Sequence, residues 1–261
     1  ASPLLFEPDS LEERLDWEKQ AWAAWEKEEA EKMRLAEEEA RKAKERLADE
    51  KKRDRDEMFH RISNSSLFAS DLAGRCDAAR KRWGLESGNT VDWHVVVLNR
   101  PADVVRDALH DVARVELLIT NTPDECVIGG QKSQVDSVVK NLGCKPIEIC
   151  GASTVHCAIA EEVRDAYRQL HLLPTTPPPN VRFYSAAWAK SFDLTREQAA
   201  DSIVDQAMRG FDFPAVIERA YADGVRVFVE PGPGSSCTRM IGKILSGRPH
   251  VARYACAEGE H

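Results

Sequence analysis

The sequence contains no run of 18 apolar residues, so it predicts no membrane-spanning helix. Its N-terminus lacks a basic stretch followed by an apolar core, and a secretory signal peptide is therefore not expected. The net charge of −8 argues against a nucleic-acid partner, because surfaces that bind nucleic acids are basic. Together these absences favour a cytoplasmic protein.

Cysteine motifs are absent as well. The seven cysteines include no C-x-x-C pair, and the spacing 144-150-157 fits no zinc-binding pattern. We expect reduced thiols packed as small apolar side chains, with no metal site.

Glycine and proline are missing between residues 11 and 57, where Ala, Glu, Lys, Arg and Leu dominate. These are strong helix formers, and several Glu–Lys and Glu–Arg pairs have the favourable i, i+4 order. Three such pairs are Glu28–Lys32, Glu37–Arg41 and Glu38–Lys42. Residues 1–57 are therefore interpreted as a long, charged helical arm or spacer.

The apolar residues of this helix are too sparse after Trp25 for a steady heptad, which makes it a poor coiled coil. Two interpretations stay open: a solvated spacer, or a partner-binding arm with an apolar docking end. That end would consist of Leu11, Leu15, Trp17, Trp22 and Trp25.

Residues 58–92 look like a connector of short helices joined by Ser and Gly turns, with Asp71 capping a helix toward Trp83. Residues 93–150 carry the clearest pattern. We expect strands at 93–98, 115–120, 125–128 and 146–150, and helices at 103–112 and 132–142. Gly129-Gly130 would end the third strand. The order β-α-β-β-α-β is typical of a ferredoxin-like subdomain.

Residues 151–261 alternate between predicted helices and strands, as in an α/β layer. The expected helices are 158–170, 195–209, 214–221 and 237–245, and the expected strands are 181–185, 225–229 and 250–255. A stiff proline-rich loop covers 174–179.

His156 follows small residues at a strand-to-helix turn, a suitable place for a general base. On position alone, a structural histidine is the more common case. The turn Gly232-Pro-Gly234 before a helix could aim N–H groups at an anion, or could simply be a tight turn. Ser235 and Ser236 lack the G-x-S-x-G elbow of a nucleophile.

Six segments in series resemble the malonyl/acyl-transferase domains of iterative polyunsaturated fatty acid and polyketide synthases. They are Asn121-Thr-Pro-Asp-Glu-Cys-Val-Ile-Gly-Gly130, Thr154-Val-His-Cys157, Val181-Arg-Phe-Tyr-Ser185, Phe211-Asp-Phe213, Ala222-Asp-Gly224 and Phe228-Val-Glu-Pro-Gly-Pro-Gly234. The resemblance extends from about residue 55 to residue 255.

The resemblance implies a mixed α/β fold: a ferredoxin-like subdomain joined to part of an α/β-hydrolase-like acyltransferase lobe. It implies that His156 is the catalytic base. It also implies that the ferredoxin-like subdomain is an insert in the lobe and contacts a carrier protein. Substrate-binding positions by the same resemblance are Thr154, Val155, Cys157, Glu230, Gly232 and Gly234.

The implied reaction is transfer of an acyl group, with malonyl expected, from coenzyme A to an acyl carrier protein. The acyl group passes through an acyl-serine to the carrier's phosphopantetheine thiol, with an oxyanion hole stabilising the tetrahedral intermediates. Coenzyme A thioester is then a substrate, and no bound cofactor is expected. The implied partners are an acyl carrier protein and other synthase domains.

The sequence departs from the family in one important respect. Where the family carries its G-x-S-x-G serine, this chain has the charged residues 41–46. The family's glutamine-bearing oxyanion loop and carboxylate-binding arginine are also absent. We expect the serine to come from another chain or segment. The identity of the acyl group stays open. The alternative is a non-catalytic docking module for a carrier protein or synthase.

Overall fold

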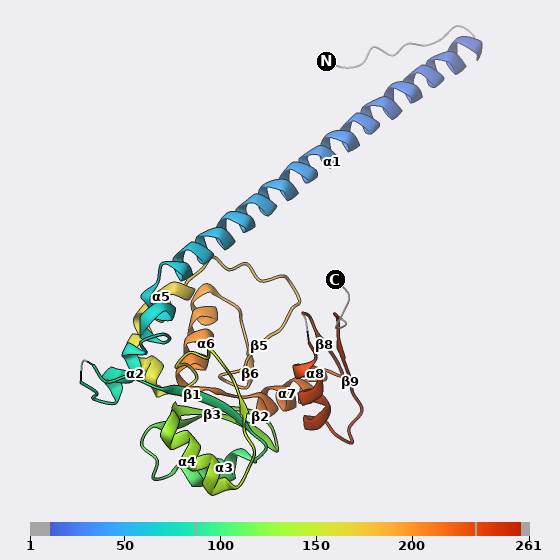
Figure 1. Cartoon of the computed structure of the whole chain (residues 1–261). Helices are drawn as coiled ribbons and strands as arrows, with labels where there is room; N and C mark the ends of the chain where they lie inside the picture. Colours follow the sequence, from blue (N-terminus) through green and yellow to red (C-terminus); the bar gives the residue numbers. More distant parts are fainter. Residues whose placement is uncertain (1–10, 87, 233, 257–261) are drawn as a thin grey trace. The chain divides into compact units, whose positions relative to one another are not determined.

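The computed structural model describes residues 11–86, 88–232 and 234–256 (Figure 1). The chain divides into two compact units, residues 1–57 and residues 58–261. None of the helices formed by the described residues combines the length and the apolarity that crossing a bilayer requires.

From residue 11 on, the first unit is a continuous helix, as the sequence predicts. Helix α1 covers Leu11–Ser63, so it runs about six residues beyond the expected end. Two of the predicted ion pairs form, Glu28–Lys32 at 2.9 Å and Glu38–Lys42 at 2.7 Å. Arg41 instead contacts Glu45, one turn further along the helix. All of these side chains face solvent, where ion pairs contribute little.

The tryptophans of α1 are exposed. Trp17, Trp22 and Trp25 each leave more than half of their surface in solvent. The rings of Trp22 and Trp25 lie 5.2 Å apart, and the side chain of Leu11 lies outside the described residues. These exposed rings form an aromatic patch near the start of α1.

The connector differs from its predicted form. A π-helix, η1, covers Leu67–Asp71, and α2 covers only Asp77–Arg82. Asp71 ends η1 and accepts a hydrogen bond from Ser66 Oγ, rather than capping the next helix. Gly74 and Cys76 have positive φ angles of 58° and 51°, and these separate the two helices.

Residues 93–148 form the predicted ferredoxin-like subdomain. Its elements are β1 (Trp93–Leu98), α3 (Ala102–Leu109), β2 (Val115–Thr122), β3 (Glu125–Gln131), α4 (Lys132–Leu142) and β4 (Ile147–Glu148). The four strands pair antiparallel in the order β4-β1-β3-β2. A short strand, β7 (Phe211–Asp212), joins the free edge of β2 in parallel.

Three strand predictions in this subdomain were wrong in extent. Strand β2 runs two residues beyond its expected end at residue 120. Strand β3 continues through Gly129 and Gly130 instead of ending there. A Cβ at Gly130 would lie 2.1 Å from the carbonyl oxygen of Arg114, so these glycines allow close strand packing. Strand β4 keeps only two residues of the expected five.

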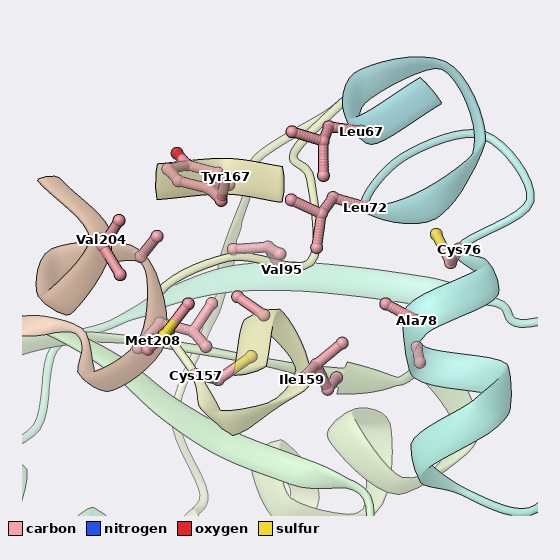
Figure 2. Close-up of a cluster of buried hydrophobic side chains, with 14 of the residues drawn as sticks. Leu67, Leu72, Cys76, Ala78, Val95, Cys157, Ile159, Tyr167, Val204 and Met208 are labelled. Carbon is pink, nitrogen blue, oxygen red and sulfur yellow. The ribbon is translucent and has the colours of Figure 1, made fainter. Parts of the chain in front are cut away.

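Each face of the sheet has its own apolar core. Helices α3 and α4 cover one face (Figure 1), where Val96, Leu98, Val105 and Ile128 are almost fully buried. The opposite face packs against η1, α2 and the helices that follow residue 157. Figure 2 shows part of this second core, which includes Leu67, Leu72, Val95, Cys157, Ile159, Tyr167, Val204 and Met208.

The remaining elements follow the predicted alternation with differences in detail. They are η2 (Ala158–Val163), α5 (Arg164–His171), β5 (Phe183–Ser185), β6 (Lys190–Phe192), α6 (Arg196–Arg209), α7 (Phe213–Ala222), β8 (Val227–Glu230), α8 (Ser236–Ile244) and β9 (Val251–Tyr254). The expected helix 158–170 is a 3-10 turn followed by an α-helix. Strands β6 and β7 were not expected, because each is only two or three residues long.

A third core lies between α7, α8 and the parallel pair β8–β9. It contains Val216, Ile217, Ile241, Ile244 and Leu245. The mixed α/β fold class, with its ferredoxin-like subdomain and long N-terminal helix, is therefore confirmed.

Candidate active site

The turn that carries His156 is fixed to the C-terminal end of α6. The N–H groups of His156 and Cys157 both donate to the carbonyl oxygen of Ala207, at 2.6 and 3.2 Å. Carbonyls in the last turn of a helix have no partner within the helix, so they are available to a neighbouring segment. Two distant parts of the sequence are joined in this way.

The same helix end orients the imidazole ring. His156 Nδ1 lies 2.9 Å from the carbonyl oxygen of Gln206. Because a carbonyl oxygen can only accept, Nδ1 must carry the hydrogen, and the neutral ring then has a bare lone pair on Nε2. Among the residues that the structure describes, Nε2 has no hydrogen-bond partner. This is the tautomer that a general base acting through Nε2 requires.

Burial sets the protonation state of the ring. The His156 side chain is half-buried, and burial lowers its pKa below the ordinary value, while the bond to Gln206 acts in the opposite direction. A lowered pKa keeps the imidazole neutral near pH 7. The same Gln206 carbonyl would stabilise the imidazolium formed when Nε2 takes up a proton.

The backbone at His156 adopts a conformation that few non-glycine residues adopt. Its φ angle is +66°, in the left-handed region. Such conformations cost free energy and persist where surrounding contacts impose them, which is common at functional sites. The contacts to Gln206 and Ala207 are of this kind.

Phe211 and Gly210 complete the surroundings of the ring. The edge of Phe211 meets the imidazole with the ring centroids 5.4 Å apart, and Phe211 pairs with Ile119 of β2. A Cβ at Gly210 would lie 2.0 Å from the Leu118 carbonyl oxygen and 3.0 Å from that of His156. Only glycine therefore allows α6, β2 and the histidine turn to approach this closely.

A cavity of about 570 Å³ lies beside β2, and Gly210 and Phe211 are part of its wall. Arg106 and Arg209 bring positive charge to it, and Glu116 brings a carboxyl group whose pKa is raised by burial. His156 does not line this cavity, but Phe211 contacts both.

The neighbours of His156 in sequence are placed more for packing than for contact with a ligand. Thr154 is fully buried, and its hydroxyl donates to the Leu72 carbonyl oxygen at 3.0 Å. Cys157 is 4% exposed within the core of Figure 2, and burial raises its pKa to about 12. Val155 is half-buried and packs against the same core.

The turn after β8 is built around an internal cap. The carboxylate of Glu230 accepts hydrogen bonds from the N–H groups of Cys237 and Thr238 and from the Thr238 hydroxyl, at 2.7 to 3.2 Å. The bond from the Thr238 backbone is the main reason that the pKa of Glu230 is lowered. Gly232 and Gly234 supply the positive φ angles of the turn, 123° and 91°. The Glu230 carboxylate thus occupies the N–H groups at the N-terminus of α8 that the sequence suggested for an external anion.

Three residues of this arrangement were given no role from the sequence: Gln206, Gly210 and Phe211. The segment 211–213 stood out as a motif, but nothing in it indicated contact with His156. Gln206 acts through its backbone carbonyl, which every residue type has, so the sequence does not indicate this contact.

The cysteines form no disulfide, and among the described residues no group of three or more His, Cys, Asp or Glu side chains could hold a metal ion. Three cysteines are buried, Cys144 is half-buried, and Cys150, Cys237 and Cys256 are exposed.

A scan against known protein families finds no match for this chain. One curated relative is a component of the polyunsaturated fatty acid synthase of Thraustochytrium sp.. The alignment spans 223 positions at 22% identity and covers 78% of this chain and 11% of the relative. The chain thus spans only a small part of that protein.

Several solved structures share the fold. The acyl-carrier-protein-S-malonyltransferase of Bartonella henselae matches with a TM-score of 0.57 and 17% identity, over 70% of this chain and 59% of that one. The acyltransferase domain from the second module of the salinomycin polyketide synthase matches with a TM-score of 0.56 and 22% identity, over 72% and 45%. A malonyl-CoA:acyl carrier protein transacylase of Xanthomonas oryzae has a TM-score of 0.54 and 19% identity, over 69% and 57%.

These similarities confirm the resemblance at the level of the fold. The chain has the fold of a malonyl/acyl-transferase-type domain, and it spans about half the length of the solved structures that it matches.

Proposed function

We propose that this chain forms the base-bearing part of an acyltransferase in fatty-acid or polyketide synthesis. In this proposal the enzyme moves an acyl group, with malonyl as the first candidate, from coenzyme A to an acyl carrier protein. The observation that carries the proposal is the orientation of His156, whose Nδ1 is occupied by the Gln206 carbonyl and whose Nε2 is free among the residues that the structure describes.

The chemistry needs a serine nucleophile, for which we propose a segment or chain outside this sequence. His156 Nε2 takes the proton of the serine hydroxyl while the serine oxygen attacks the thioester carbonyl. The tetrahedral intermediate expels the coenzyme A sulfur, which receives the proton from His156. The acyl group is then esterified to serine, and the base is regenerated.

The second half-reaction repeats these steps with the carrier protein. His156 takes the proton of the phosphopantetheine thiol, and the sulfur attacks the acyl-serine ester. The serine oxygen leaves and recovers the proton. His156 therefore alternates between base and acid, which suits a ring whose pKa lies below the ordinary histidine value.

The other predicted site residues stay proposals, and their geometry limits what they could do. The buried side chains of Thr154 and Cys157 could shape the site only through their backbone. Glu230 would act by holding the turn with Gly232 and Gly234 in place.

Reconstitution with a G-x-S-x-G-bearing chain tests the proposal. Transfer of labelled malonyl from coenzyme A to a carrier protein is measured for the wild type and for His156→Ala. We expect the variant to lose activity on the order of 10³-fold, since base and nucleophile act as a unit.

His250→Ala is the matched control. His250 is also half-buried and also bonds a backbone carbonyl through Nδ1, that of Arg248 at 2.8 Å. Its loss should leave transfer within about twofold of the wild type. Equal activity of the two variants would refute a catalytic role for His156.

A docking function is the second candidate, and the exposed tryptophans of α1 favour it. In that case the chain would bind a synthase component without taking part in chemistry. A complex that forms and transfers acyl groups regardless of His156 would support this alternative.

A further inference from the structure

The parallel strands β8 and β9 form a sheet that is covered on one face only. Phe228 and Ala252 face α7 and α8 and belong to the third core. On the other face, Val227, Val229 and Val251 are 64%, 63% and 44% exposed. Val227 pairs directly with Val251, so the three valines share one continuous apolar face.

A bare apolar face is unusual for parallel strands, which nearly always have a packed layer on both sides. The sequence of β8 agrees with burial on both sides, because apolar residues point to both faces rather than alternating with polar ones. The valine face thus has the composition of an interior surface.

The edges of this sheet are open too. Within residues 11–86, 88–232 and 234–256, β8 and β9 pair only with each other. Open edges with apolar side chains are sites where further strands add. An occupant could therefore extend the sheet and cover the valine face at once.

The remainder of an acyltransferase lobe fits these requirements. The chain covers 59% of the Bartonella henselae enzyme and 45% of the salinomycin domain. A large part of each of those folds is thus formed by residues that have no counterpart here, and an open sheet is where such residues would pack.

We propose that the Val227–Val229–Val251 face and the adjacent strand edges dock the serine-bearing part of the lobe. This inference rests on the proposed function and specifies where the nucleophile segment attaches. Arg253, which pairs with Val229 and is exposed on the same face, would meet an acceptor group of that segment.

Photo-crosslinking identifies the occupant. The full chain carries p-benzoyl-L-phenylalanine in place of Val229, is expressed in its native host and is irradiated. A second sample carries the probe in place of Val104, which is 44% exposed on α3 and serves as the control. We expect the probe at position 229, and not at 104, to give adducts with a polypeptide that contains a G-x-S-x-G segment.

An adduct with a second copy of this chain, an adduct with a carrier protein, or a yield no higher than that at position 104 would each overturn the proposal. Affinity for the crosslinked polypeptide then gives a quantitative check. Val229→Asp should weaken binding on the order of 100-fold, because it buries an unpaired charge, whereas Val104→Asp should change it less than about threefold.

The same variants separate this inference from the proposed function. His156→Ala should leave binding unchanged while transfer is lost. If Val229→Asp abolishes the complex but the wild-type complex transfers no acyl group, the docking surface stands and the proposed function fails. If transfer depends on His156 but Val229→Asp leaves binding unchanged, the proposed function stands and the docking surface fails.

Discussion

Replacing Arg239 with methionine should leave a buried carboxylate without its cation. Arg239 of α8 forms a bidentate pair with Glu125 of β3, with N–O distances of 3.0 and 3.1 Å. The Glu125 side chain is 8% exposed and accepts one more hydrogen bond, from Asn121 at 3.1 Å. This pair connects the ferredoxin-like subdomain to the C-terminal helices.

The expected loss of stability follows from the burial of the two partners. Removing one partner of a fully buried ion pair costs about 3–5 kcal/mol. Arg239 is 48% exposed, so water can partly solvate Glu125 in the variant, and the bond from Asn121 remains. We therefore expect a loss of about 2 kcal/mol, which lowers Tm by about 4–8 °C for a unit of this size.

The stabilisation by this pair should depend on pH in a defined direction. The pKa of Glu125 is lowered, mainly by its hydrogen bonds from Arg239. A carboxyl group whose pKa is lowered in the folded state stabilises the fold fully above the ordinary glutamate pKa of about 4.3. This stabilisation is lost as the pH falls from there through the lowered pKa. The difference in Tm between the wild type and Arg239→Met should thus be full at pH 7 and shrink below about pH 4.

Thermal unfolding followed by circular dichroism measures these effects. Lys132→Met is the control, because Lys132 and Asp136 form an exposed pair at 2.9 Å whose loss should shift Tm by no more than about 1 °C. Adding Glu125→Gln to Arg239→Met should restore part of the stability, since the amide carries no charge. A shift as small as that of the control, or one independent of pH, would show that Arg239 does not stabilise a buried Glu125 carboxylate.

Two further predictions concern the surroundings of His156. Gly210→Ala should lose about 3 kcal/mol in denaturant unfolding, because its Cβ would clash with the Leu118 carbonyl oxygen at 2.0 Å and its φ of 70° disfavours other residues. Gly242→Ala, on an open surface of α8, should instead gain about 0.5–1 kcal/mol. In the native protein at pH 8, iodoacetamide should label the exposed Cys150 and spare Cys157, whose buried thiol has a pKa of about 12; labelling of Cys157 at a similar rate would contradict its placement.

The sequence predicts the ferredoxin-like subdomain well because its signals are local. Short runs rich in Val, Leu and Ile mark β1 and β2, and Gly143 closes α4 with a φ of 56°, as the position of a glycine after a helix indicates. Thr195 caps α6 at the start of the expected helix 195–209, with its hydroxyl accepting from the Gln198 N–H group. In each case the residues that decide the structure lie within one turn of it.

The features that were missed depend on contacts between distant segments. Strand β7 exists because Phe211 and Asp212 lie against the edge of β2, some 90 residues earlier in the chain. The role of Glu230 as an internal cap depends on the turn that brings α8 back to it. The tautomer of His156 is set by a backbone carbonyl 50 residues away, which no residue pattern could indicate.

The protonation state of His156 in the isolated chain decides whether this histidine is held as a general base. Nitrogen-15 NMR of the histidine rings, titrated from pH 4 to pH 9 and assigned with His156→Ala, reports both the tautomer and the pKa. The account predicts a hydrogen on Nδ1, a bare Nε2, and a pKa below the ordinary value of about 6.5, so that the ring is neutral at pH 7. A hydrogen on Nε2 in the neutral ring, or a pKa above the ordinary value, would contradict the claim that this histidine is held as a general base.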